Sequence, residues 1–307
     1  MRALMLSLPF IALTVACSAG TQGADGSGGS AANGTSGTNG FTSTTGGFGT
    51  GSSGSGGNNN GCSAAAQLVY VFSSDNKIYS FDPPAKKFTF VATPDCMASG
   101  QANSMAIDRN LVAWLNYIGS IYTFDLKTKT GCKLAMTLPA NFTQVGMGFS
   151  TDAADGTAET LYVDGIGGGG LAKIDTATKT LTPIGGFNND PKLAGQSAEL
   201  TGTGDARLFG YFTTSPNVRV AQIDKGKAGI TSDHELLGVS PPSSWAFTFW
   251  GGDFYLYAAP GNNGTGNTSV IHYSPSTNAV DATYVADVGF QIIGAGVSTC
   301  APIIPPN

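Results

Sequence analysis

Short apolar segments separated by turn residues recur along the chain from residue 62 onward. In one kind of segment apolar and polar residues alternate, the last residue is Asp or Ser, and a turn rich in Pro, Lys, Thr, Gly or Asn follows. Such alternation predicts half-buried β-strands. Five segments have this pattern: 77–82, 120–125, 170–175, 218–224 and 269–274. Their last residues are 43, 50, 49 and 50 positions apart, a spacing typical of one four-stranded β-propeller blade.

Each of these strands has neighbours that complete a four-stranded repeat. A strand that contains an aromatic residue precedes each one, at 68–72, 111–115, 160–163, 207–212 and 254–258. A further strand follows each one, at 87–91, 132–137, 181–184, 235–239 and 283–286. The first strands of four repeats are expected at 104–108, 147–152, 198–203 and 245–250. They are rich in Gly and small residues, as strands crowded around a central axis should be.

The N-terminal repeat lacks a first strand, because Cys62 lies directly before its second strand. A first strand without successors stands at the other end of the chain, at 291–299. We therefore expect the C-terminal strand to pair into the N-terminal blade, which protects sheet edges that would otherwise pair with other chains. The prediction is an all-β, five-bladed propeller over residues 62–303 with a tail at 304–307. The alternative, a six-bladed propeller, needs a further repeat that the sequence does not show.

The first 16 residues have the layout of a signal peptide. Arg2 precedes an apolar run that is too short to span a membrane and that ends in small residues. The segment 13–17, Leu-Thr-Val-Ala-Cys, resembles a lipobox, which implies cleavage before Cys17 and a diacylglycerol (palmitate-type) anchor on its thiol. An ordinary secretory signal with an incidental cysteine is the alternative. Ser18 after the cysteine favours, by analogy with enterobacterial sorting, the outer membrane, with the domain facing the periplasm or the cell surface.

Residues 17–61 consist of the anchor cysteine and a low-complexity linker of Gly, Ser, Thr, Asn and Ala. Such a composition has almost nothing apolar to bury and behaves as a flexible coil. We expect a disordered tether between the lipid and the propeller, since buried acyl chains hold a protein on a bilayer without a spanning helix.

Four cysteines remain once Cys17 carries lipid, and they allow three disulfide pairings in an oxidising compartment. Ring closure brings Cys62 beside Cys300, so we expect that bond. Cys96 and Cys132 border the outer strands of neighbouring blades and form the second pair. No two of these cysteines are closely spaced and the chain has only two histidines; we expect no metal site and no cofactor.

The net charge and the candidate catalytic residues exclude few classes of function. The chain has 15 Lys and Arg against 20 Asp and Glu without a basic cluster, and we expect no nucleic-acid partner. The acids expected near the axis are Asp108, Asp152, Glu199, Asp205 and Asp253. All but Glu199 end a first strand at a turn, where capping hydrogen bonds are the ordinary role. Glu199 lies inside a strand among apolar residues.

An aromatic cluster occupies the first strand at 245–250, namely Trp245, Phe247, Phe249 and Trp250. Packing between blades is its ordinary role, and stacking on a sugar is the alternative. If the propeller is an extracellular enzyme acting on polysaccharide, Glu199 and Asp108 are the first residues to mutate, although a glycosidase needs two carboxylates at a set separation.

The chain resembles a group of uncharacterised myxobacterial lipoproteins in four sequence segments, at 146–152, 198–205, 249–254 and 294–302. The resemblance implies export, a tether and a repeat domain, and it brings no activity with it. The leading hypothesis is a monomeric, membrane-anchored binding or scaffold module that is not an enzyme and that meets a protein or glycan at a propeller face or at the axial mouth. The alternatives are the polysaccharide-acting enzyme and a structural envelope protein.

Overall fold

A computed structural model describes residues 61–154, 156–214, 217–260 and 266–306. The signal peptide predicted at 1–16, the anchor Cys17 and the tether up to residue 60 lie outside these residues, and they stay predictions.

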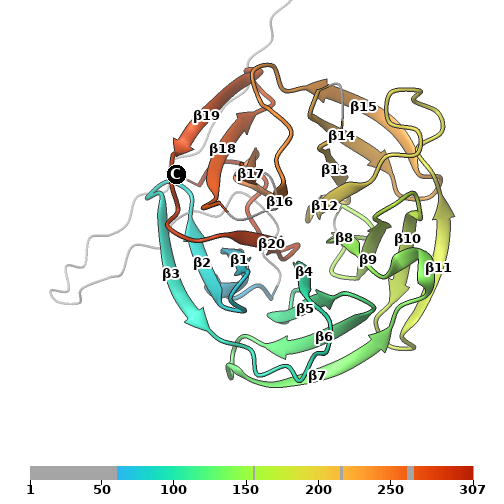
Figure 1. Ribbon diagram of the computed structural model, residues 1–307, viewed down its shortest axis with the longest axis vertical. Coiled ribbons are helices and arrows are strands. Elements are labelled where there is room, and N and C mark those ends of the chain that lie inside the picture. Colours follow the sequence, from blue (N-terminus) through green and yellow to red (C-terminus); the bar gives the residue numbers. More distant parts are fainter. Residues whose placement is uncertain (1–60, 155, 215–216, 261–265, 307) are drawn as a thin grey trace, which may run out of the picture. The chain divides into compact units, whose positions relative to one another are not determined.

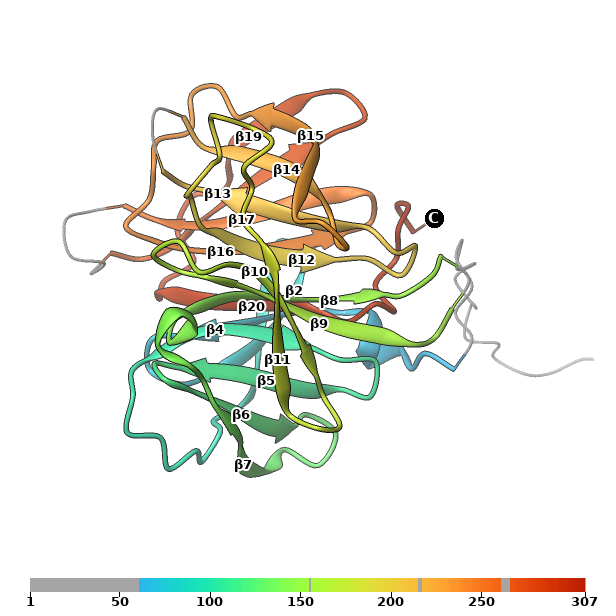
Figure 2. The same ribbon diagram turned by 90° about the vertical axis from the view of Figure 1, so that its right-hand side faces the viewer.

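The described residues form five antiparallel sheets of four strands each, set around a common axis (Figures 1 and 2). Each sheet is one blade, and its strands are given from the innermost to the outermost. Blade 1 consists of β20 (Ile292–Val297), β1 (Val69–Ser73), β2 (Ile78–Asp82) and β3 (Lys87–Ala92), and blade 2 of β4 (Ala102–Ile107), β5 (Val112–Tyr117), β6 (Ser120–Asp125) and β7 (Thr130–Thr137). Blade 3 consists of β8 (Val145–Thr151), β9 (Glu159–Gly165), β10 (Gly170–Asp175) and β11 (Thr180–Gly185), blade 4 of β12 (Ala198–Gly202), β13 (Leu208–Phe212), β14 (Arg219–Asp224) and β15 (Gly229–Glu235), and blade 5 of β16 (Ser244–Trp250), β17 (Asp253–Ala259), β18 (Ser269–Ser274) and β19 (Ala279–Val285). The five-bladed prediction is confirmed and the six-bladed alternative is wrong.

The ring closes as predicted, between the two ends of the domain. β20 pairs antiparallel with β1, with Val71 opposite Ala295, and the two lie side by side in Figure 1. Cys62 and Cys300 form a disulfide with their Cα atoms 5.7 Å apart. The Ser298 hydroxyl donates to the carbonyl of Ala66 at 2.6 Å. Backbone pairing, a covalent bond and a buried side-chain hydrogen bond therefore join the ends of the chain.

The second disulfide, Cys96–Cys132, also matches the predicted pairing, with a Cα–Cα distance of 5.0 Å. It joins the connection after β3 to the outermost strand β7, and so links blades 1 and 2 at their outer edges.

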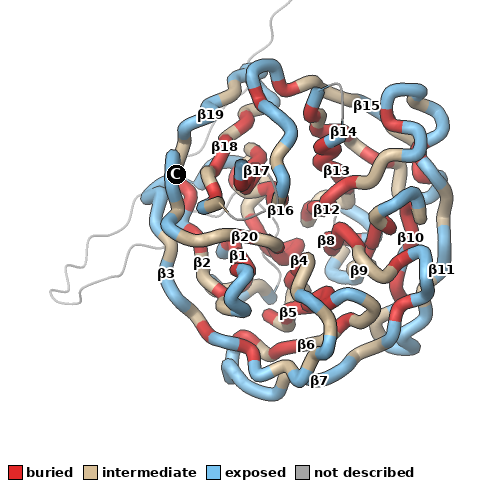
Figure 3. The backbone as a smooth tube through the Cα atoms, viewed as in Figure 1, coloured by how far each residue is buried: buried red, intermediate tan, exposed pale blue. Residues whose placement is uncertain are grey.

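Glycines of the innermost strands allow the blades to approach closely. A Cβ atom on Gly146 of β8 would lie 2.1 Å from the carbonyl oxygen of Ala198 on β12, and one on Gly202 would lie 2.2 Å from that of Phe149. Both distances are far below van der Waals contact, so no larger residue fits. The crowding predicted for strands at the axis is confirmed, and these strands are mostly buried (Figure 3).

Apolar side chains fill the spaces between adjacent blades. In the space between blades 4 and 5, Phe247 and Phe249 pack with Phe254 and Tyr211. Trp245 and Trp250 are partly buried against core clusters, so all four residues of the aromatic cluster predicted at 245–250 take part in packing. Trp250 donates its indole N–H to the carbonyl of Gln67 at 2.8 Å. Trp245 is only partly buried.

One strand lies elsewhere than predicted. The outermost strand of blade 4 was expected at 235–239 and is Gly229–Glu235. The preceding turn ends at Ala228, which has a positive φ of 54° without the Gly or Asn that normally indicates such a position. The apolar residues after the strand produced the wrong prediction: Leu236 is buried in the core, whereas Leu237 is 77% exposed.

Candidate functional site

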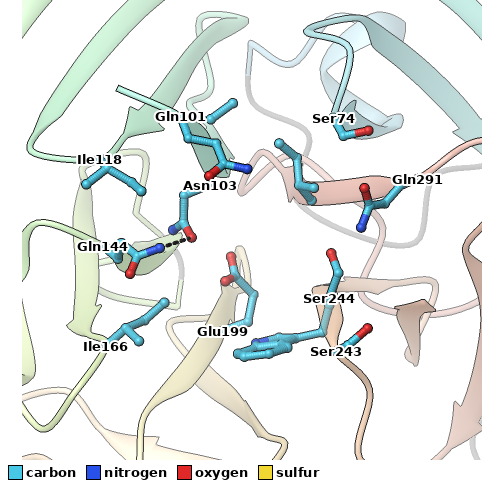
Figure 4. Close-up of a pocket in the computed structure, with 13 residues that line it drawn as sticks. Ser74, Gln101, Asn103, Ile118, Gln144, Ile166, Glu199, Ser243, Ser244 and Gln291 are labelled. Atoms are coloured by element: carbon cyan, nitrogen blue, oxygen red, sulfur yellow. Dashed lines mark hydrogen bonds between the residues drawn. The ribbon is translucent and has the colours of Figure 1, made fainter. Parts of the chain in front are cut away.

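A cavity of about 440 Å³ opens on the axis at the end where the innermost strands begin. All five blades line it (Figure 4). Its described lining is Ser74, Gln101, Ala102, Asn103, Ile118, Gln144, Ile166, Glu199, Ser243, Ser244, Trp245, Gln291 and Ile293. We call this cavity the axial mouth.

The topology of the blades brings these residues together. Gln101, Gln144, Ser243 and Gln291 each stand just before an innermost strand. Ser74, Ile118 and Ile166 come from the turns between the second and third strands of blades 1 to 3. Both kinds of segment lie at the same end of a blade, because the strands alternate in direction.

Glu199 forms the floor of the axial mouth. It is the second residue of β12 in blade 4 and is 3% exposed. Its Oε1 accepts a hydrogen bond from the hydroxyl of Ser104 in blade 2 and a longer one, 3.4 Å, from the backbone N–H of Met147 in blade 3. The side chain therefore spans the axis. Burial raises its pKa to about 8, although the hydrogen bond from Ser104 opposes the shift.

Two further buried polar groups lie near this floor. Asp164 of β9 accepts a hydrogen bond at Oδ2 from the N–H of Ala198, at 2.7 Å, while its Oδ1 has no partner among the described residues. Burial raises the pKa of Asp164 to about 7. Tyr211, opposite Glu199 in the β12–β13 register, is fully buried, and its hydroxyl has no hydrogen-bond partner within the described ranges. No Lys, Arg or His is among the described residues that line the mouth.

Some of the lining amides hold one another in place. The Asn103 amide donates to Oδ1 of Asn116 at 2.9 Å and to the carbonyl of Val145 at 3.1 Å. The Gln144 amide donates to Oδ1 of Asn103 at 3.4 Å (Figure 4). The part of the rim between blades 2 and 3 is thus partly preorganised.

The second candidate residue, Asp108, lies at the opposite end of the innermost strands and does not meet Glu199. It follows the last residue of β4, and its Oδ1 accepts from the N–H groups of Asn110 and Val112 at 2.9 Å each. This is the capping role expected for it. Burial raises its pKa.

Asp108 shares a smaller cavity, of about 340 Å³, with Glu159 and Arg109. Glu159 accepts hydrogen bonds from the N–H of Arg109 at 2.8 Å and from the hydroxyl of Thr299 at 2.6 Å. Burial is the largest of the effects that raise its pKa to about 7. Hydrogen bonds within the fold thus occupy both of its oxygens.

The other three acids expected near the axis bond to side chains rather than capping turns. Asp152 accepts from the Thr160 hydroxyl at 2.7 Å, Asp205 pairs with Arg207 at 2.8 Å, and Asp253 with His272 at 2.8 Å. None of the three lines the axial mouth. No group of three or more His, Cys, Asp or Glu side chains within the described ranges is arranged to hold a metal ion.

Sequence patterns missed most of the lining. Gln101, Gln144, Ser243 and Gln291 stand outside the predicted strand repeat or at its edge, where neither periodicity nor a motif distinguishes them. Their shared position, just before each first strand, was the available clue.

Comparisons with known proteins give a likeness in fold only. No protein-family model matches the chain, and no curated protein does. Among solved structures, a chain in the crystal structure of a nidogen/laminin complex is 10% identical with a TM-score of 0.46, and the match covers 75% of this chain and 97% of that one. A streptogramin B lyase structure is 16% identical with a TM-score of 0.41, covering 72% and 65%. A protein of unknown function from Bacteroides caccae is 10% identical with a TM-score of 0.41, covering 75% and 98%.

Proposed function

We propose that this protein is a membrane-anchored binding module: a lipid on Cys17 holds the propeller at the outer membrane, and the axial mouth binds a ligand. The observation that carries the proposal is the mouth itself, a cavity of about 440 Å³ to which all five blades contribute side chains. Ligand sites are typically concave, of a few hundred Å³, with a few convergent polar groups.

The position of the mouth suits a tethered protein. The described chain begins beside Cys62, which is bonded to Cys300 just beyond the C-terminal end of β20. The mouth opens at the other end of the innermost strands, where β4, β16 and β20 begin. A tether that enters the domain at Cys62 leaves the mouth on the side of the domain away from the point of attachment. No helix within the described ranges is both long and apolar enough to cross a membrane.

The enzyme hypothesis named two carboxylates, Glu199 and Asp108. Their separation in the fold favours binding over glycoside hydrolysis. Glu199 lies at the beginning of β12, whereas Asp108 follows the end of β4, and each belongs to a different cavity. A glycosidase needs its two carboxyl groups within roughly 5–10 Å of each other on either side of the scissile bond.

The binding half of the proposal is tested by blocking the mouth. The mature chain with Cys17→Ser is purified without detergent and applied to arrays of glycans and of peptides. Gln101 is an exposed residue of the mouth, and Gln101→Trp should abolish whatever binding is found. Asn110→Trp places the same bulk at the opposite opening and should leave it unchanged. Binding that survives Gln101→Trp, or no binding on either array, contradicts the proposal.

The anchor half is tested in cells. Labelling with radioactive palmitate should mark the full-length protein, and Cys17→Ala should abolish the label and release the protein from membranes. Full labelling of the Cys17→Ala variant contradicts the lipid anchor.

A further inference from the structure

Seven of the thirteen described side chains that line the axial mouth are uncharged hydrogen-bonding groups, and four are aliphatic: Ala102, Ile118, Ile166 and Ile293. The described lining holds the amides Gln101, Asn103, Gln144 and Gln291 and the hydroxyls Ser74, Ser243 and Ser244. Amides and hydroxyls both donate and accept, as the hydroxyls of a sugar do. A charged ligand would instead need an opposite charge or a set of charge-assisted hydrogen bonds, and among these residues only Glu199 is ionisable.

Trp245 adds a flat apolar surface to this polar ring. It lines the mouth, and it is partly buried because it packs against the core cluster of Tyr211 and Phe247. Packing from behind restrains the indole, which lowers the entropy lost when a ligand stacks on it. An aromatic ring beside amides and hydroxyls offers contacts to both the apolar face and the hydroxyl edge of a pyranose.

Glu199 presents to the mouth one oxygen, Oε2, that accepts no hydrogen bond from the part of the chain that the structure describes. Oε1 accepts from Ser104 and Met147, and no hydrogen bond to Oε2 occurs among the described residues. In the described part of the chain, Oδ1 of Asp164 and the hydroxyl of Tyr211 are the fully buried side-chain atoms that lack a partner, and Oε2 is not one of them. Figure 4 shows the carboxyl group reaching toward the centre of the mouth.

The surroundings of Glu199 favour its neutral form. Ser104 and Met147 face it from β4 and β8, Tyr211 is its register partner on β13, and Asp164 of β9 raises its pKa further by charge repulsion. None of these groups is a cation. A proton on Oε2 makes this atom a donor aimed at the ligand, while Oε1 keeps its two hydrogen bonds.

We propose that the ligand of the axial mouth is an uncharged carbohydrate unit, which stacks on Trp245, bonds to the ring of amides and serines, and accepts a hydrogen bond from protonated Glu199. This inference rests on the proposed function, because it names the ligand class of the same cavity. It also predicts a pH dependence. Burial raises the pKa of Glu199 to about 8, so at about pH 9 only about one molecule in ten keeps the proton and the apparent Kd rises about tenfold.

The test uses the mature Cys17→Ser chain, with calorimetry against oligosaccharides of cellulose, chitin, mannan and galactan as neutral probes. Alginate and polygalacturonate oligosaccharides serve as charged probes. At least one neutral probe should bind, and the charged ones should not. Trp245→Leu should weaken binding at least about tenfold, because it removes the flat surface on which the sugar stacks. Trp245→Phe keeps a smaller ring and should lose less affinity. It serves as the control for misfolding of the leucine variant.

Glu199→Gln separates the donor role from a structural one. The amide of Gln donates at every pH while its oxygen still accepts from Ser104, so this variant should bind within a few-fold of the parent near neutral pH and lose the decline toward about pH 9. Asp108→Asn, at the other end of the strands, should keep the parental profile. A Glu199→Gln variant that retains the decline overturns the role of Glu199.

The two proposals fail differently. If a charged probe or a peptide binds and Gln101→Trp blocks it, the mouth is a binding site but the carbohydrate inference is wrong. If no probe is sensitive to Gln101→Trp, the proposed function itself is wrong.

Discussion

The hydroxyl of Ser104 on β4 donates a hydrogen bond to Glu199 on β12, although a whole blade separates these two strands around the ring. The bond crosses the axis past Met147 of the intervening blade 3, whose N–H shares the same acceptor oxygen. Blades 2, 3 and 4 are thereby tied together at one buried carboxyl group. This arrangement makes the floor of the axial mouth both a structural junction and a titratable group.

Stability should fall as the pH rises, because of the buried carboxyls. Burial raises the pKa of Glu199 to about 8 and that of Asp164 and of Glu159 to about 7, against about 4 in an unfolded chain. Between these values the folded state binds more protons than the unfolded state, so the free energy of unfolding decreases from about pH 4 to about pH 8. Urea unfolding of the parent at several pH values in this range measures the slope.

Glu199→Gln and Asp164→Asn should each flatten that slope, and the double variant should flatten it further. Asp125→Asn is the matched control, because hydrogen bonds from the backbone of its exposed turn lower the pKa of Asp125. Its contribution is lost only as the pH falls below about 4. Stability that increases between about pH 5 and pH 8 contradicts the assignment of raised pKa values.

The two disulfides should contribute unequally to stability. Cys62–Cys300 closes a segment with a sequence separation of 238, and Cys96–Cys132 one of 36. The chain-entropy model assigns about 5 kcal/mol to the first and about 4 kcal/mol to the second. The Cys62→Ser/Cys300→Ser variant also frees the closing strand pair β20–β1, so its Tm should drop more than that of Cys96→Ser/Cys132→Ser. Thermal melts under non-reducing conditions measure the two Tm values. A larger drop in Tm for the Cys96→Ser/Cys132→Ser variant would falsify ring closure as the dominant contribution.

Substitution of an axial glycine should be far more damaging than substitution of a peripheral one. Gly146→Ala places a Cβ atom 2.1 Å from the carbonyl oxygen of Ala198 and 2.7 Å from Cα of Glu199, and we expect a loss of about 3 kcal/mol or more. At Gly185, on the outermost strand β11, the nearest atom to an added Cβ is 3.6 Å away. Gly185→Ala should therefore change stability little. Denaturant midpoints of the two variants compare the effects directly.

One lysine in a turn should be replaceable by glycine with a gain in stability. Lys129 has a φ of +58°, a conformation that costs a residue with a Cβ atom about 1–2 kcal/mol. The added freedom of Gly in the unfolded chain offsets part of that, leaving a gain of about 0.5–1 kcal/mol for Lys129→Gly.

Lys179 provides the comparison. It has the equivalent position in blade 3, with a φ of +60°, but its Nζ lies 4.3 Å from the ring centroid of Trp114 in blade 2. Lys179→Gly gives up that contact, worth about 0.5–1 kcal/mol, and should be near neutral. Equal gains at both positions indicate that the cation–aromatic contact adds nothing.

Sequence alone determined the architecture of the described domain. The spacing of the alternating segments established five repeats, and the missing strand before Cys62 matched the unpaired strand at 291–299, so closure and both disulfides followed. Strand periodicity and cysteine position are local properties that the repeat makes comparable from blade to blade. The start of β15 escaped prediction because the apolar Leu236 and Leu237 after the strand shifted the expected strand to 235–239, although Leu237 is exposed.

Only the tertiary structure decided what the domain presents at its axis. The successive residues Gln101, Gln144, Ser243 and Gln291 are 43, 99 and 48 positions apart in sequence, and each by itself is an ordinary polar residue next to a strand. Likewise, the alternation of β12 identified Glu199 as unusual but could not show that its carboxyl reaches Ser104 two blades away. Side chains from separate repeats meet only when the ring closes, and the strand pairing that closes it acts over the full length of the domain.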